Sequence, residues 1–111
     1  MSLRTPKARV VNKWKYHQVS MNGLNITTLY TNGYAEFKKN GDVTFFIRPD
    51  SINYGSWSLS DDKKTIEIDM IDQAGATTWS EDFSILKLKG QEMSLSGDVN
   101  GTTMKIDYLQ Y

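Results

Sequence analysis

The sequence predicts an all-β fold, a single antiparallel up-and-down β-barrel of about eight strands. Four Asn-Gly pairs begin at residues 22, 32, 40 and 100, and this dipeptide tolerates the positive φ angles of tight hairpin turns. Between the turns, apolar and polar residues alternate, as they do in strands with one buried and one solvated face. A sheet built from sequential hairpins with one apolar face closes most simply into a barrel.

The alternating segments give nine candidate strands. In one of them Val43, Phe45 and Ile47 share a face, and in another Ile66 and Ile68 do. Residues 18 to 26 fit the pattern poorly and leave room for a short helix or a lid loop. We expect strands near residues 9 to 17, 27 to 31, 34 to 39, 43 to 48, 54 to 60, 65 to 71, 77 to 88, 92 to 97 and 102 to 110.

One segment breaks the alternation. Phe83 and Ile85 fall on one face, whereas Leu86 and Leu88 fall on the other. An extra residue in the strand would return Leu88 to the interior and add the bend that a closing sheet needs. We therefore predict a β-bulge in this segment.

Length and composition favour one small domain. The chain has 111 residues, no Cys, and 13 basic residues balanced by 13 acidic ones. Zero net charge argues against nucleic acid as a partner, and the absence of Cys excludes disulfides and thiolate metal sites. Residues 9–111 are expected to form the barrel. Residues 1–8 are expected to be a flexible N-terminal segment, either added by cloning or left as a linker behind a removed export signal.

No apolar run approaches the ~20 residues that span a bilayer as a helix, so no transmembrane segment is expected. The opening residues also lack the apolar core of a signal peptide. A monomer or a weak dimer is expected.

Several motifs resemble the lipocalin-like domains of Bacteroidetes. They are Trp14 in the first strand, the hairpin segment from Tyr34 to Val43, and the stretch from Tyr54 to Ile66 with its Gly-Ser-Trp-Ser-Leu core. The later segments 83–88 and 93–97 are similar as well, and Asn12 stands where the family's first signature has Gly. The resemblance implies a calycin-like barrel that encloses a small hydrophobic ligand. It also implies export to the periplasm or attachment to the cell surface as a lipoprotein.

The aromatic residues are the main candidates for a binding site. Three Trp, four Phe and six Tyr can either fill a small barrel as packed core or line a modest cavity, and Met residues suit both roles. The tyrosines at 16, 30, 34 and 54, together with Trp79, are expected nearer the mouth. The candidate ligand-binding residues, in the barrel interior or mouth, are Trp14, Phe37, Phe45, Tyr54, Trp57, Ile68 and Met104.

Candidates for catalysis are few. His17 is the only histidine, so a three-histidine zinc site cannot form and any His-containing triad would have to use His17. The carboxylates at residues 61, 62, 67 and 69 sit in a charged turn or on a solvated strand face, as charged residues usually do. No catalytic residue, metal site or cofactor is expected.

The sequence thus favours a non-catalytic module of the cell envelope that binds an apolar or amphipathic small molecule. One alternative is a structural or protein-interaction domain with a side-chain-filled barrel, whose outer face over residues 26 to 31 and 105 to 111 would carry the contact. A second is an enzyme that uses carboxylates in the barrel mouth. A cavity lined by Trp14, Phe45 and Trp57 would favour the first hypothesis.

Overall fold

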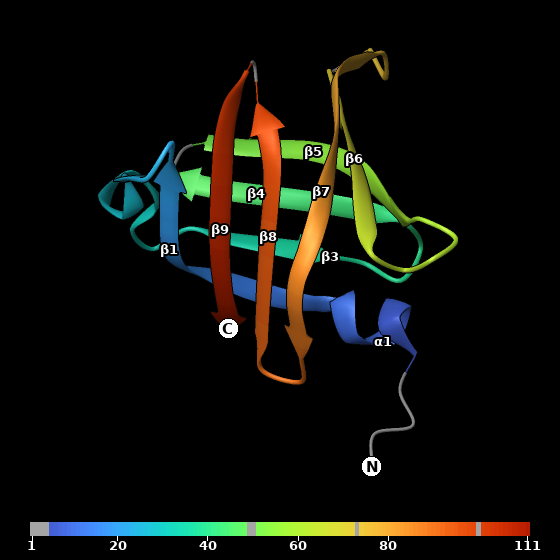
Figure 1. Ribbon diagram of the computed structural model, residues 1–111. Helices are drawn as coiled ribbons and strands as arrows, with labels where there is room; N and C mark the ends of the chain where they lie inside the picture. Colours follow the sequence, from blue (N-terminus) through green and yellow to red (C-terminus); the bar gives the residue numbers. More distant parts are fainter. Residues whose placement is uncertain (1–4, 49–50, 73, 100) are drawn as a thin grey trace.

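The computed structural model describes residues 5–48, 51–72, 74–99 and 101–111. In these residues nine strands join in one antiparallel sheet, accompanied by two short helices (Figure 1). The helices are α1 (Pro6–Val10) and the 3-10 helix η1 (Thr27–Tyr30). The strands are β1 (Asn12–Met21), β2 (Leu24–Asn25), β3 (Tyr34–Phe37), β4 (Asp42–Arg48), β5 (Ser51–Leu59), β6 (Thr65–Ile71), β7 (Thr77–Lys89), β8 (Glu92–Val99) and β9 (Thr102–Gln110).

Strand β1 closes the barrel because it pairs with both ends of the strand series. Its first residues, 12–15, pair with β3, and residues 14–21 pair with β9. The register with β9 shifts between Tyr16 and Gln18, which places a bulge at His17. In Figure 1, β1 bends between the group β3 to β5 and the group β7 to β9, which cross each other. The predicted closed antiparallel barrel is confirmed, with eight strands in the wall and β2 as a short extension of β1.

The predicted bulge in β7 is confirmed. The register between β7 and β8 shifts between Ile85 and Lys87, so Leu86 is the extra residue and is 55% exposed. Beyond it, Leu88 packs against the core. The inserted residue therefore restores the inward direction of the strand, as the sequence required.

The Asn-Gly pairs that begin at residues 22, 32 and 40 lie in turns as predicted, whereas Asn100 of the fourth pair lies outside the described residues. Asn22 and Gly23 both have positive φ, 48° and 81°, which is the pattern of a type I′ hairpin turn. Gly41 has φ 96° and closes the β3–β4 connection. These dipeptides set the hairpin positions because few other residue pairs adopt such angles without strain.

One prediction near the N-terminus is wrong. The strand expected from residue 9 begins at Asn12, because Pro6–Val10 form α1, whose first turn is capped by the Thr5 hydroxyl accepting from the Ala8 N–H at 3.1 Å. Of the N-terminal segment 1–8, residues 6 to 8 lie in this helix and residues 1–4 lie outside the described residues.

The strand expected at residues 27 to 31 is instead η1, and residues 18 to 26 mostly extend the sheet through β1 and β2. The Thr27 hydroxyl accepts from the N–H of Val19 at 3.0 Å and donates to its carbonyl oxygen at 3.3 Å. Asn25 Oδ1 accepts from the Thr27 N–H at 2.9 Å. These side-chain bonds replace the backbone ladder that a strand would have used.

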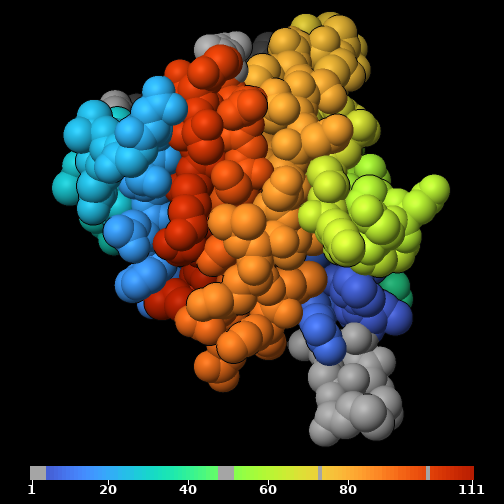
Figure 2. Space-filling view, in the orientation of Figure 1, coloured from blue at the N-terminus to red at the C-terminus, as the bar shows by residue number. Residues whose placement is uncertain are grey.

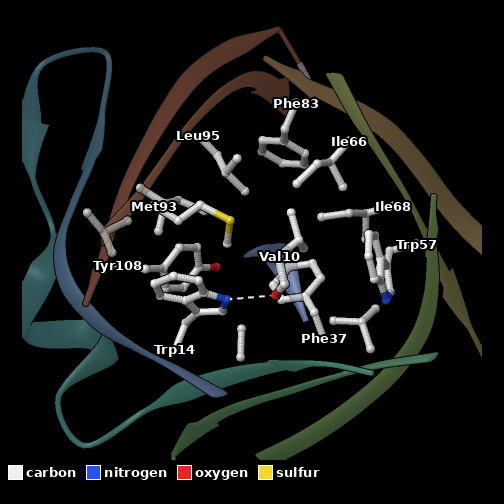
Figure 3. Packing of buried hydrophobic residues seen from close by; sticks show 14 residues of the cluster. Val10, Trp14, Phe37, Trp57, Ile66, Ile68, Phe83, Met93, Leu95 and Tyr108 are labelled. Atoms are coloured by element: carbon white, nitrogen blue, oxygen red, sulfur yellow. Dashed lines mark hydrogen bonds between the residues drawn. The ribbon is translucent and has the colours of Figure 1, made fainter. Parts of the chain in front are cut away.

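The end of the barrel covered by α1 is filled with core side chains. Figure 3 looks along the barrel and shows the Trp14 indole donating to the Val10 carbonyl oxygen at 3.0 Å. Phe37 and Trp57 meet edge to face with ring centroids 5.6 Å apart. The most deeply buried large side chains are Val10, Trp14, Val19, Phe37, Val43, Ile66, Met93, Leu95 and Tyr108. In Figure 2, α1 is seated at the lower end of the barrel beside β7, and the outer surface over β7, β8 and β9 is continuous.

Neither helix of the described chain has the length and apolar character needed to cross a membrane.

Candidate functional site

A cavity of about 180 Å³ occupies the end of the barrel opposite α1. It lies where β4 ends and β5 begins, near the β6–β7 and β8–β9 hairpins, with η1 on one side. The lining residues are Tyr16, Tyr30, Phe45, Ile47, Asn53, Ile68, Met70, Trp79, Phe83, Leu95, Val99, Met104, Ile106 and Tyr108. One end of the barrel is therefore filled with side chains and the other is hollow.

The cavity wall is apolar because the same alternation that builds the core continues along each strand. Ile68 and Met70 follow Ile66 on the inner face of β6, and Met70 pairs with Trp79 of β7. Phe83 and Ile68 lie between the cavity and the filled end, and both are buried. The side of the cavity that faces the filled end is therefore apolar.

Three tyrosines form a cluster at the cavity wall. The Tyr16 ring lies 4.8 Å from that of Tyr30 and 5.0 Å from that of Tyr108, measured between centroids. Burial raises the pKa of Tyr16 and of Tyr108 above the usual tyrosine value, and a hydrogen bond between their hydroxyls raises the pKa of Tyr108 further while opposing the rise at Tyr16. Burial also raises the pKa of Tyr30. The cluster is therefore uncharged at neutral pH and can donate or accept hydrogen bonds.

The charge at this site comes from one side chain on the inner face of β7. Glu81 pairs with Ile68 across the ladder, and directly paired residues point to the same side of a sheet. Its side chain is half-buried and stands between Trp79 and Phe83 in the alternation, although it does not line the cavity itself. Among the described lining residues there is no Lys, Arg or His.

Three of the seven predicted ligand-binding residues line the cavity: Phe45, Ile68 and Met104. Trp14, Phe37 and Trp57 do not. They belong to the filled end, where they are 0%, 1% and 5% exposed, and the Trp57 indole donates to the Lys38 carbonyl oxygen at 3.0 Å.

Tyr54 lies outside the barrel. It is 60% exposed and pairs with Thr44 and Ile71 on the outer face. It stands three residues before the inward-facing Trp57, and an odd separation along a strand puts two side chains on opposite faces. Counting along the strand could therefore have placed it correctly from the sequence.

Of the residues expected near the mouth, Tyr16, Tyr30 and Trp79 line the cavity. Tyr34 does not, because it stacks on Phe46 on the outer face with ring centroids 5.1 Å apart. Sequence reasoning missed Asn53, whose even separation from Trp57 along β5 was the available signal. The other lining residues that were not among those predicted for the site or the mouth are Ile47, Met70, Phe83, Leu95, Val99, Ile106 and Tyr108.

The site offers little for catalysis. None of the described residues that line the cavity is acidic, and Glu81 is the carboxylate that the strand ladders place on the inner face beside it. His17 is exposed on the bulge of β1, outside the cavity. Within the described part of the chain, no three His, Cys, Asp or Glu residues are grouped as metal ligands.

The fold and site together define a small calycin-like barrel, closed at one end by a helix and hollow at the other. No family model matches the sequence, and no curated protein matches it. Two solved structures share its fold. A lipocalin-like protein from Bacteroides uniformis ATCC 8492 aligns with a TM-score of 0.63 at 15% identity, over 93% of this chain and 99% of that one.

An uncharacterized protein from Bacteroides eggerthii DSM 20697 aligns with a TM-score of 0.64, also at 15% identity, over 91% of this chain and 98% of that one. The resemblance found in the sequence motifs is thereby confirmed for the fold. At this identity, the comparisons extend to the fold alone.

Proposed function

We propose that this protein is a non-catalytic binding module that holds a small apolar molecule in the cavity opposite α1. The observation that carries the proposal is the contrast within one barrel between a filled end and a hollow end. Packed interiors normally leave few voids larger than a water molecule, and a concave apolar site with a few hydrogen-bonding groups is typical of small-molecule binding.

The expected affinity is modest. A ligand that buries about 200 Å² of apolar surface gains roughly 5 kcal/mol at about 25 cal/mol per Å². Association and ordering take back part of this gain. The dissociation constant should therefore fall near the millimolar range or somewhat below, since 1 mM corresponds to about −4 kcal/mol.

Tryptophan fluorescence tests the proposal, because Trp79 lines the cavity while Trp14 and Trp57 lie in the filled end. Titration with p-xylene, excited at a wavelength that the probe does not absorb, should give a saturable one-to-one change. Val99→Phe fills part of the cavity and should weaken binding. Leu86→Phe adds a ring on the exposed bulge and is the matched control. A flat titration of the folded protein, checked by an NMR chemical-shift titration, would reject the proposal.

The proposal extends to the cell envelope, where the protein would act after export, as a periplasmic protein or a surface lipoprotein. The motif resemblance and the Bacteroides origin of the structural neighbours support this location. Fractionation of cells that carry the full-length gene would test it, and recovery in the cytoplasmic fraction would contradict it.

A second candidate function, a protein-interaction module, is favoured by an aromatic patch on the outer face. The Lys13 Nζ lies 4.2 Å from the ring centroids of both Tyr34 and Tyr111. Phe46 stacks on Tyr34 and pairs with Ile52, which is 48% exposed. The face predicted at residues 105 to 111 has no free edge, because β9 pairs with β8 and β1. Concentration-dependent light scattering, abolished by Ile52→Lys, would favour self-association through this patch.

Catalysis by carboxylates in the mouth has less support. A glycosidase-like pair needs two carboxyl groups about 5 to 10 Å apart. The described inner-face positions beside the cavity supply Glu81 only.

A further inference from the structure

We infer that the cavity takes a neutral molecule of a single ring that carries one hydroxyl group, and that it excludes carboxylates and long acyl chains. This inference rests on the proposed function, since it names the chemical class of ligand for the same cavity. It follows from the size of the cavity, the position of its hydroxyl groups and the sign of the charge beside it.

The size limits the ligand to one ring. An apolar protein cavity of roughly 150 Å³ accepts benzene, whereas sites for drug-sized ligands are about 300 to 1,000 Å³. At about 180 Å³, this cavity has room for a benzene-sized ring and one or two further heavy atoms. Haem, retinoids and long fatty acids are too large for it.

The wall favours an aromatic ring. Tyr30, Phe45, Trp79 and Phe83 surround the void, and the Trp79 and Phe83 rings are tilted 53° to each other with centroids 6.2 Å apart. Aromatic rings prefer such tilted and edge-to-face neighbours over parallel sandwiches. A flat ring entering the cavity therefore meets partners on several sides.

The tyrosine cluster supplies the hydrogen bond. The buried Tyr108 hydroxyl is paired with that of Tyr16, and the Tyr16 ring packs against the half-buried Tyr30. Each hydroxyl has a donor and acceptor sites, so a ligand hydroxyl can accept from one tyrosine and donate to another. A ligand without a hydroxyl leaves the Tyr16–Tyr108 hydrogen bond in place but forgoes this additional one, at a cost in affinity.

Charge excludes anions. A carboxylate that enters the cavity loses its water and finds no described Lys, Arg or His on the wall. Burying an unpaired charge in an apolar environment is strongly unfavourable. Glu81, on the same inner face as Trp79 and Phe83, adds like-charge repulsion.

Three probes of one shape test the inference by the NMR chemical shifts of the cavity residues. They are p-cresol, p-xylene, in which a methyl group replaces the hydroxyl, and 4-methylbenzoate. We expect p-cresol to bind about two- to tenfold more tightly than p-xylene, the range for one net hydrogen bond, and 4-methylbenzoate at least about tenfold more weakly than p-cresol.

Variants locate the hydrogen bond. Tyr16→Phe and, separately, Tyr30→Phe should reduce the preference for p-cresol over p-xylene while leaving p-xylene binding unchanged. Tyr30 is half-buried, so its variant remains informative if Tyr16→Phe disturbs the fold. Tyr54→Phe, on the outer face, is the matched control and should change neither affinity.

The outcomes separate the two proposals. If none of the probes binds the folded protein, the proposed function fails. If p-xylene binds as tightly as p-cresol, or 4-methylbenzoate binds as tightly as either, the proposed function stands and this inference is overturned. Retention of the full p-cresol preference in both tyrosine variants would also overturn it.

Discussion

The two ends of this barrel use the same kinds of residue for different purposes. At the α1 end, the indoles of Trp14 and Trp57 donate to backbone carbonyl oxygens at 3.0 Å and their rings are buried. At the other end, Trp79 is half-buried and lines a void. An inward-facing aromatic residue therefore either packs in the core or lines the cavity, according to what covers its end of the barrel. Here that cover is a five-residue helix.

The largest expected difference between the ends is in stability. Phe37→Ala should lower the free energy of unfolding by about 3 to 5 kcal/mol, since it leaves a void in close-packed surroundings. Met104→Ala, beside the existing cavity, should lose less than about 2 kcal/mol because its side chain is only partly buried. Urea denaturation of both variants measures the contrast. Equal losses would contradict the distinction between a filled end and a hollow end.

The second prediction concerns Gly97, which lies against Phe83, the residue between the filled end and the cavity. A Cβ on Gly97 would lie 2.8 Å from Phe83 Cδ2 and 3.1 Å from the Asp82 carbonyl oxygen. Gly97→Ala should cost about 1 to 3 kcal/mol of stability by overpacking, and should weaken p-xylene binding because the Phe83 ring forms part of the cavity wall.

The matched control for this variant is Gly90→Ala in the β7–β8 turn, where a Cβ meets no atom within 4 Å. Urea denaturation and the fluorescence titration should show little change in this control. If Gly97→Ala changed neither the free energy of unfolding nor p-xylene binding, the sheet would open at this position more easily than the packing suggests.

The third prediction concerns the tyrosines between the two ends. Because the pKa values of Tyr16 and Tyr108 are raised in the folded protein, both groups keep their protons in the native state at a pH where unfolded tyrosines lose them. Their contribution to stability is complete below about pH 10 and falls above it, by up to about 1.4 kcal/mol per pH unit for each group.

Urea midpoints measured from pH 8 to 11.5 should therefore decline above pH 10. The double variant Tyr16→Phe and Tyr108→Phe should flatten this decline, and Tyr54→Phe should not. A decline of the same steepness in the double variant would assign the alkaline sensitivity to other groups.

The smallest expected effect lies on the outer face. Lys13→Met removes the ammonium group between the rings of Tyr34 and Tyr111 but keeps a long apolar side chain. It should cost about 0.5 to 1 kcal/mol, the usual value of an exposed cation–π contact, and leave cavity binding unchanged. Lys15→Met on the neighbouring exposed position is the control in the same denaturation experiment. A change in p-cresol affinity would show that the outer face and the cavity are coupled.

Much of the fold followed from local patterns. The hairpin turns at Asn22-Gly23 and Asn40-Gly41, the alternation of β6, and the bulge at Leu86 were predictable because turn angles and strand faces are properties of neighbouring residues. The helix α1 and the 3-10 helix η1 were missed. For α1 a local signal was available, because Thr5 caps the helix and Pro6 follows it. The burial of Val10 at the barrel end and the bonding of Thr27 to Val19, eight residues away, are recorded by no local pattern.

The candidate site was predictable only in part. Whether a side chain points into the barrel could be read from odd and even separations along each strand. This alternation selected Phe45, Ile68 and Met104, and it could have excluded Tyr54. Height along the barrel axis was not available. This height places Trp14, Phe37 and Trp57 in the filled end. It depends on the stagger between strands and on which end α1 covers.

The sequence by itself therefore determined the class of fold, the turns, the inner and outer faces, and the neutral, cysteine-free character of the chain. The tertiary structure alone decided that one end is filled and the other hollow, and that the rings of Tyr16, Tyr30 and Tyr108 gather beside the cavity. The physical reason is that faces are set by neighbours one or two residues apart, whereas depth and enclosure are set by contacts between strands far apart in the chain.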